Sequence, residues 1–246
     1  MLIINKILAE FNPISLEEMD EVKLMNRSDT KFVFSQKTLL NILPLLQSFY
    51  RVLVVDGVRL SSYKSLYYDT EDFQFYHQHH NGKTNRNKVR FREYVDSGLT
   101  FLEVKLKNNK GKTIKKRVRV NETQHSLVGD NKSFVEELVG ERLNLIPRHW
   151  NHFQRITLVH KLQKERLTID VDFRFQDKSQ EGQIEGMVIA EVKQEKKSRA
   201  SDFMRIIKKE GIHPFRISKY CIATARLYPE LKRNNFKRKF LHLNKI

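Results

Sequence analysis

The sequence predicts an α+β fold dominated by an antiparallel sheet of about eight strands. Several segments alternate charged with apolar residues, as where Val89 and Phe91 separate Lys88, Arg90 and Arg92. Because successive side chains of a strand point to opposite faces, each such segment has one charged and one apolar face. Short polar turns join consecutive segments, and such turns are typical of antiparallel hairpins.

Each strand and helix follows from its local pattern. Alternation between turn residues predicts strands at 26–34, 50–55, 61–68, 85–95, 99–107, 113–120, 152–161, 166–175 and 187–193. Apolar residues at helical spacing predict helices at 36–47, 133–143, 201–210 and 218–226. Ser15 and Glu18 form a capping-box pattern for a further short helix, and Pro44 is expected to kink or split the helix at 36–47.

The charged faces of the strands are predicted to line a tunnel. The helices carry apolar stripes that must pack on the apolar faces of the strands, so the charged faces should lie on the other side of the sheet. Neighbouring arginines such as Arg90 and Arg92 repel unless an anion lies between them, and a guanidinium suits phosphate oxygens. We therefore expect a closed barrel with a charged tunnel and helices packed outside. An open sheet with a solvated charged face is the alternative.

Composition indicates an anionic partner and a reducing compartment. The 246 residues contain 46 Lys+Arg against 29 Asp+Glu, a formal net charge of +17. Cys221 is the only cysteine, which excludes a disulfide framework and a cysteine zinc site. Residues 1–11 are too short and polar for a signal peptide, and no segment approaches the length of a membrane span. We expect one cytoplasmic domain over 1–246 with a basic tail at 232–246.

Several common catalytic motifs are absent from the sequence. It contains no GxxxxGK[ST] loop, no GxGxxG fingerprint, no HExxH and no GxSxG. P-loop, dinucleotide-binding, zinc-protease and esterase classes are therefore excluded. His77, His79 and His80 are expected on one strand, where they cannot all point the same way, so a metal site there is not favoured.

A series of short motifs resembles a known family. In order along the chain they are Arg27-x-Asp29-x-Lys31, Tyr67-Tyr68-Asp69-Thr70, Arg90-x-Arg92, Glu103-x-Lys105, Lys115-x-Arg117, Arg155, Arg166-Leu167-Thr168-Ile169-Asp170, Glu191-x-Lys193 and Arg216-x-Ser218-Lys219-Tyr220. At these residues the chain resembles the VTC domain, the polyphosphate polymerase module of the triphosphate tunnel metalloenzyme superfamily. The resemblance runs from about 27 to 226.

The resemblance implies a tunnel that holds ATP or polyphosphate together with Mn²⁺ or Mg²⁺. The metal would lie on Glu191, with Glu103 as a second candidate. The implied phosphate ligands are Lys31, Arg90, Arg92, Lys105, Lys115, Arg155, Arg166, Lys193, Arg216, Ser218 and Lys219. Arg90, Arg92, Arg166 and Lys219 would stabilise the transferred phosphoryl group. Phe153 stands where the family often has a tyrosine, so one hydroxyl contact to phosphate is missing.

The predicted activity is metal-dependent phosphoryl transfer, with polyphosphate synthesis from ATP as the first hypothesis. An inorganic triphosphatase or polyphosphatase of the same fold is the alternative, because water and a terminal phosphate could attack at the same site. A non-catalytic module that binds polyphosphate or nucleic acid is the third hypothesis. Carboxylates on the charged strand faces favour an enzyme over a nucleic-acid binder. Recruitment to a membrane through a protein partner stays open.

Overall fold

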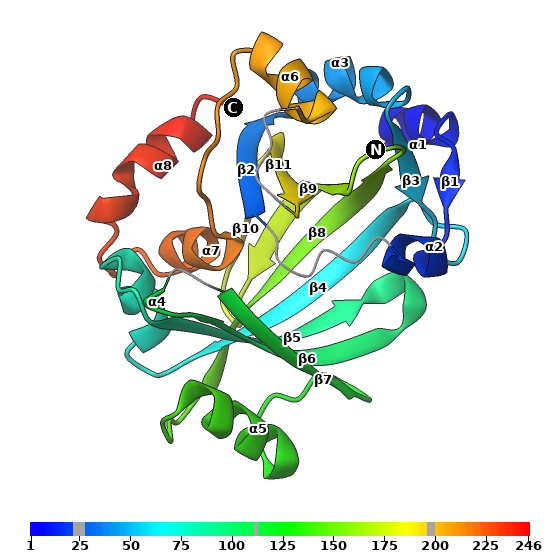
Figure 1. Cartoon of the computed structure of the whole chain (residues 1–246). Helices are drawn as coiled ribbons and strands as arrows, with labels where there is room; N and C mark the ends of the chain where they lie inside the picture. The colour runs from blue at the N-terminus through cyan, green and yellow to red at the C-terminus, as the bar shows by residue number, and fades with distance from the viewer. Residues whose placement is uncertain (22–27, 111–112, 196–199) are drawn as a thin grey trace.

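Eleven strands form one sheet in the computed structural model, which describes residues 1–21, 28–110, 113–195 and 200–246 (Figure 1). The main path of the sheet runs β2-β11-β9-β8-β4-β5-β6-β7. The strands of this path are β2 (Ser28–Ser35), β4 (Leu60–Asp69), β5 (Arg86–Tyr94), β6 (Leu99–Lys107), β7 (Thr113–Val120), β8 (Ile146–His160), β9 (Glu165–Gln176) and β11 (Met187–Gln194). Three short strands pair beside it: β1 (Pro13–Ile14), β3 (Tyr50–Leu53) and β10 (Glu181–Gln183).

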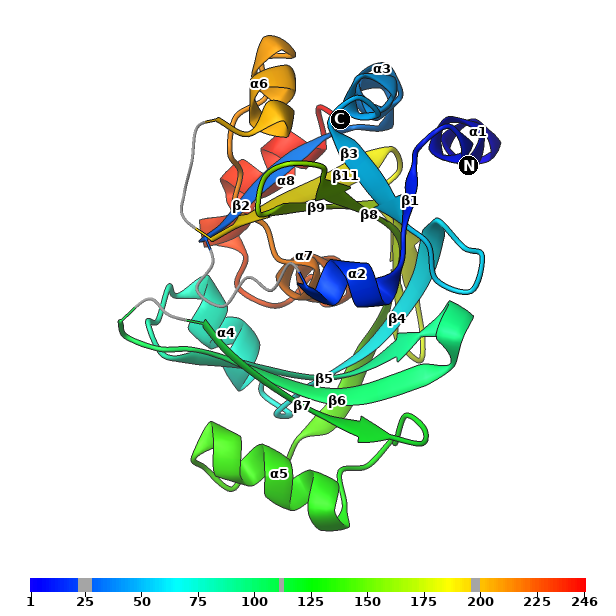
Figure 2. The same cartoon turned by 45° about the vertical axis from the view of Figure 1, so that its right-hand side comes forward.

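The sheet curves so strongly that its two halves face each other (Figure 2). All neighbours along the main path pair antiparallel, as predicted. Hydrogen bonds do not close the sheet into the predicted barrel, since β2 and β7, the two ends of the path, share none among the described residues. One physical reason is that the free edge of β2 is already occupied: the backbone N–H of Phe215 donates to the carbonyl of Lys31 at 2.7 Å.

Helices α1 (Leu2–Ala9), α3 (Gln36–Leu46) and α6 (Asp202–Lys209) pack outside one half of the sheet, and α5 (Gly129–Val139) packs outside the other (Figure 1). The Ser35 side chain accepts a hydrogen bond from the backbone N–H of Thr38 and so caps α3. The apolar stripe of this helix is buried on the sheet, and Pro44 lies inside the helix, two residues before its end. The capping box of α2 (Leu16–Glu21) is also present, since Ser15 and Glu18 exchange hydrogen bonds.

Helix α7 (Lys219–Leu227) departs from the prediction that all four helices lie opposite the charges. Its Ile222 and Ala223 belong to the same buried cluster as Val33 and Ile189. Val33 and Ile189 share a strand face with Lys31 and Glu191, so α7 lies on the charged, concave side of the sheet (Figure 2). A helix in this position brings its first residues into the space between the two halves.

The other differences between the predicted and the observed elements concern mainly the helices. His77, His79 and His80 lie on helix α4 (Gln74–His80), so their placement on a strand is corrected. The sequence predicts no helix at α1 or at α8 (Lys237–Leu243), although both exist. Helix α5 begins at Gly129 rather than at 133, and β8 begins at Ile146 rather than at 152.

The predicted motif residue Arg27 lies outside the described residues. No helix among the described residues has the length and apolarity needed to cross a membrane.

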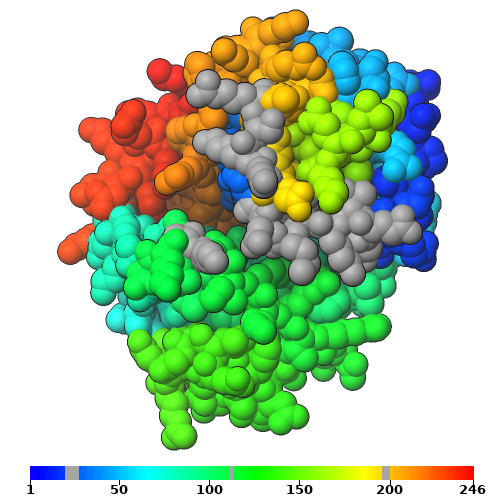
Figure 3. Space-filling view, viewed as in Figure 1, coloured from blue at the N-terminus to red at the C-terminus, as the bar shows by residue number. Residues whose placement is uncertain are grey.

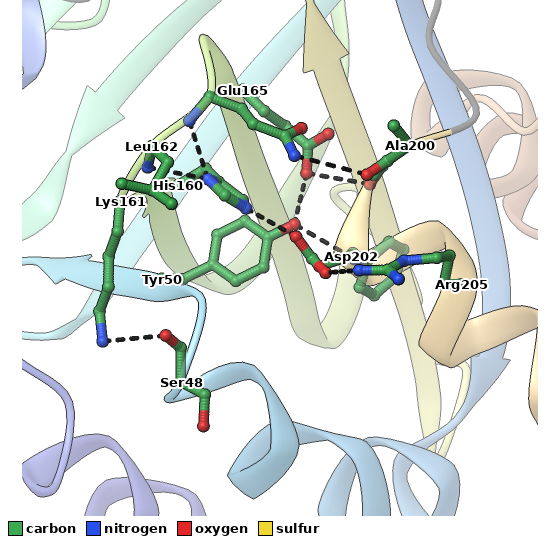
Figure 4. A network of polar contacts seen from close by, with 12 residues as sticks. Ser48, Tyr50, His160, Lys161, Leu162, Glu165, Ala200, Asp202 and Arg205 are labelled. Atoms are coloured by element: carbon green, nitrogen blue, oxygen red, sulfur yellow. Dashed lines mark hydrogen bonds and ion pairs between the residues drawn. The ribbon is translucent and has the colours of Figure 1, made fainter.

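A buried polar network fixes α6 to the sheet (Figure 4). The Tyr50 hydroxyl donates to Glu165 and accepts from the backbone N–H of Phe203 at 3.2 Å. The second carboxylate oxygen of Glu165 accepts from Gln194 at 2.9 Å. These groups are buried, so each hydrogen bond that is lost leaves a polar atom without water to replace its partner.

Replacing Tyr50 with Phe should lower the free energy of unfolding by about 1–3 kcal/mol, because Glu165 and the Phe203 N–H each lose a buried partner. Chemical denaturation measures this value. Arg174→Gln is the control, since its ion pair with Asp172 is solvent-exposed and should change stability by less than about 1 kcal/mol. Equal stability of Tyr50→Phe and the unsubstituted protein would contradict the prediction.

Candidate active site

A cavity of about 300 Å³ lies between the two halves of the sheet. In Figure 3 the surface is hollowed between the orange chain that leads into α7 and the green strands, and blue atoms of β2 are visible inside. Ten cationic and three acidic side chains are among the described residues that line it. The cations are Lys31, Lys88, Arg90, Arg92, Lys105, Lys115, Arg155, Arg166, Lys193 and Lys219, and the acids are Asp29, Asp170 and Glu191.

The pairing of the strands places these charges side by side. In β5 the cations Lys88, Arg90 and Arg92 share one face because strand side chains alternate. Arg90 lies opposite Glu103 of β6, so a cation faces a carboxylate across the ladder. The apolar faces of the same strands form the core under α5, where Val89 is fully buried. Shifting any of these strands by one residue would bury its charges in that core.

Glu103 holds two cations of one wall in place. Its carboxylate accepts from Nε and Nη2 of Arg90, at 2.8 and 2.6 Å, and forms an ion pair with Lys115. Nη1 of Arg90 donates to the hydroxyl of Tyr67 at 2.8 Å. Burial by itself raises the pKa of Glu103, but nearby cations, Arg90 first, hold that pKa well below its usual range. Glu103 therefore stays ionised and fixes the orientation of Arg90.

Asp170 plays the same part on the opposite wall. It accepts from Nε and Nη2 of Arg155, at 2.5 and 2.8 Å, and forms an ion pair with Lys219. Burial raises the pKa of Asp170, but Arg155 and Lys219 outweigh that effect and hold it well below its usual range. The Phe153 ring lies 4.2 Å from Nζ of Lys219, a cation–π contact that keeps the ammonium beside the apolar wall.

Glu191 lines the cavity and keeps partial contact with solvent. Its carboxylate lies 3.7 Å from Nζ of Lys31 and 2.9 Å from Nζ of Lys193, and its side chain is 18% exposed. Burial raises its pKa, but Lys193 and Lys31 hold the pKa well below its usual range. Among the residues that the structure describes, no three His, Cys, Asp or Glu side chains converge as metal ligands.

A divalent cation at Glu191 would depend on the substrate for its other ligands. Mg²⁺ is commonly held by one or two carboxylates together with phosphate oxygens and water. Glu191 fits that role, because it lines the cavity and keeps solvent contact. Glu103 fits it less well, because the carboxylate is only 1% exposed and already accepts from Arg90 and Lys115.

Most of the predicted phosphate ligands meet at this cavity. Those that line it are Lys31, Arg90, Arg92, Lys105, Lys115, Arg155, Arg166, Lys193, Ser218 and Lys219. Arg216 instead lines an adjoining cavity. The predicted metal ligand Glu103 is buried and forms an ion pair with Arg90. Lys88 and Tyr67 also line the main cavity although the sequence does not assign them a role there. Lys88 could have been found, since it begins the same alternation as Arg90 and Arg92.

Comparison with solved structures identifies the fold of this site. A protein from Bacillus halodurans described as a candidate adenylate cyclase superposes with a TM-score of 0.53 at 14% identity, over 79% of this chain and 96% of that one. A candidate adenylyl cyclase from Hippeastrum, described as having a dominant triphosphatase activity, gives a TM-score of 0.54 at 13% identity, over 82% and 96%. The chain thus shares the fold of these two proteins.

The particular family follows from the sequence. The VTC domain family matches residues 26–228, so the chain belongs to that family and the predicted resemblance is confirmed. No curated protein matches the sequence.

Proposed function

We propose that this chain binds ATP and polyphosphate in the cavity and transfers the γ-phosphoryl group of ATP to the end of a polyphosphate chain. The observation that carries the proposal is the set of ten cations that line one cavity around Glu191. Membership of the VTC domain family supports it. Phosphoryl transfer needs mainly positioning and charge stabilisation, and a wall of fixed Arg and Lys side chains supplies both.

In the proposed reaction, a terminal phosphate oxygen of the chain attacks the γ-phosphorus of ATP. A new P–O bond forms, the bond to the β–γ bridging oxygen breaks, and ADP leaves with that electron pair. Arg90 and Arg155 each keep N–H groups that their carboxylates do not use, and these groups can bind the equatorial oxygens. Arg92, Arg166 and Lys219 add positive charge around the same space.

Glu191 would hold the divalent cation, which supplies charge neutralisation between phosphate groups when bound. Lys31 and Lys193 then bind the phosphate oxygens beside it. Glu103 and Asp170 act through Arg90 and Arg155, so they are positioning residues in this proposal.

Hydrolysis is the second candidate reaction. The Hippeastrum protein that shares this fold is described as having a dominant triphosphatase activity. In hydrolysis, water would attack the terminal phosphorus with the same cations around it. Tripolyphosphate as the substrate separates the two reactions, because a hydrolase releases phosphate from it in the absence of ATP.

Replacing Glu191 with Gln should reduce turnover of ATP with Mn²⁺ by at least about 100-fold, because it removes the proposed metal ligand. The assay measures acid-insoluble polyphosphate and free phosphate together. Glu181→Gln, at an exposed position of β10, is the matched control and should keep full turnover. Retained turnover in Glu191→Gln would overturn the metal assignment, and no turnover in the unsubstituted protein would overturn the proposed function.

A further inference from the structure

A second cavity of about 260 Å³ adjoins the first. The two cavities share Lys88, Lys105, Ile217 and Ser218 as lining residues. The shared wall means that one extended ligand could contact both cavities without leaving the protein surface.

Positive charge dominates the second cavity even more strongly than the first. Its described lining includes six Lys and Arg side chains together with His79, and no Asp or Glu. The six are Arg86, Lys88, Lys105, Lys107, Arg216 and Lys239. In the part of the chain that the structure describes, none of these six forms an ion pair with a carboxylate.

This unneutralised charge indicates an anionic ligand. Burial beside other cations lowers the pKa of Lys88 to about 7, and burial beside Lys88 and Arg86 lowers the pKa of His79. The wall is therefore electrostatically crowded in the absence of a ligand. A polyanion would relieve the repulsion, and each phosphate can accept hydrogen bonds from more than one cation.

The C-terminal tail forms part of this cavity. The hydroxyl of Tyr76 donates to the carbonyl of Lys232 at 2.9 Å, and Asn235 donates to the carbonyl of His80 at 3.0 Å, so the tail is attached to α4. Nζ of Lys239 lies 4.4 Å from the centre of the Phe236 ring. Both residues lie beyond residue 228, where the match to the VTC domain ends. The tail thus adds one cation, Lys239, to the cavity from outside the matched residues.

We infer that the second cavity is a polyanion site that binds the part of a linear polyphosphate extending out of the first cavity. The inference rests on the proposed function, because it assumes that phosphates occupy the first cavity. Tripolyphosphate is too short to need the second cavity, whereas a long chain gains contacts with Arg86, Lys107 and Lys239. The site therefore selects for chain length.

The test is a triple variant, Arg86→Gln, Lys107→Gln and Lys239→Gln, which leaves the lining of the first cavity unchanged. Dissociation constants for tripolyphosphate and for long-chain polyphosphate are measured at fixed salt. We expect long-chain affinity to fall by about tenfold or more and tripolyphosphate affinity to stay within about twofold, since a charge-assisted contact contributes about tenfold.

A second triple variant carries the same change in net charge at exposed positions elsewhere: Lys116→Gln, Arg142→Gln and Lys178→Gln. It should bind both ligands as the unsubstituted protein does. Equal losses in the two triple variants, or equal losses for both ligands, would overturn the inference. So would displacement of long-chain polyphosphate by duplex DNA at equal phosphate concentration. Because binding needs no turnover, an inactive protein that still shows the selective loss refutes the proposed function alone.

Discussion

Replacing Asp170 with Asn is expected to lower the free energy of unfolding by about 3–5 kcal/mol, because Arg155 and Lys219 would lose their shared carboxylate in a buried place. Asp170 is only 5% exposed, so water cannot replace the lost charge. Chemical denaturation without a ligand measures the loss.

Tripolyphosphate should restore part of this stability. Its oxygens can accept the hydrogen bonds that Arg155 and Lys219 no longer make to the carboxylate, and a ligand that binds only the folded state stabilises it. The shift of the melting temperature on adding tripolyphosphate should therefore be larger for Asp170→Asn than for the unsubstituted protein. A smaller shift would contradict the assignment of Asp170 as a residue that positions cations for phosphate.

Asp172→Asn is the matched control. Asp172 lies two residues further along β9, pairs with the exposed Arg174, and has a left-handed backbone (φ 52°) that Asn also tolerates. It should change stability by less than about 1 kcal/mol. If Asp170→Asn does not fold, the double variant with Lys219→Met provides the test, since it removes one of the two stranded cations. No recovery in the double variant would show that the ion pair is not the cause.

Most strands can be predicted from the sequence, because a strand is marked by the alternation of neighbouring residues. Alternation at Lys88, Arg90 and Arg92 reports both the strand and which face is charged. The cations that line the cavity could be picked out for the same reason, although their convergence on one cavity depends on curvature of the sheet that no local pattern encodes. Asp170 becomes the partner of Arg155 because strand pairing places the two residues opposite each other.

Long-range packing explains what the sequence does not predict. The apolar residues of α7 indicate that it packs on a sheet but not on which side, and it packs on the charged side because Val33, Phe153 and Ile189 form an apolar patch there. Closure of the barrel likewise depends on which segment of the chain pairs with the free edge of β2. The backbone N–H of Phe215 bonds to that edge. Arg216 consequently lies beside the second cavity rather than the first.

The affinity for tripolyphosphate is expected to fall by about 100-fold between pH 7 and pH 9 at constant salt. Burial, with neighbouring cations, lowers the pKa of Lys88 to about 7 and those of Lys193 and Lys219 to about 8. Above pH 8 these lysines are largely neutral in the empty cavity, and a polyanion binds their charged forms. Binding must then add protons, and the affinity falls as the pH rises.

The fall of affinity with rising pH identifies the lysines, and not the ligand, as its cause. Loss of a further proton would make the ligand more negative and strengthen its attraction to cations, so the ligand cannot explain weaker binding at high pH. Arginines stay charged throughout this range, so binding weakens but does not disappear. Titration calorimetry in two buffers of different ionisation enthalpy should show proton uptake at pH 8.

Stability without a ligand should change in the opposite direction over the same window. A lysine whose pKa is lower in the folded state than in the unfolded chain binds fewer protons when folded, so stability rises with pH between about 7 and 10. Lys193→Arg with Lys219→Arg should make both curves less steep, because arginine does not titrate there while Lys88 still does. Tripolyphosphate affinity that is constant from pH 7 to 9 would contradict the prediction and show that the buried lysines do not contact the ligand.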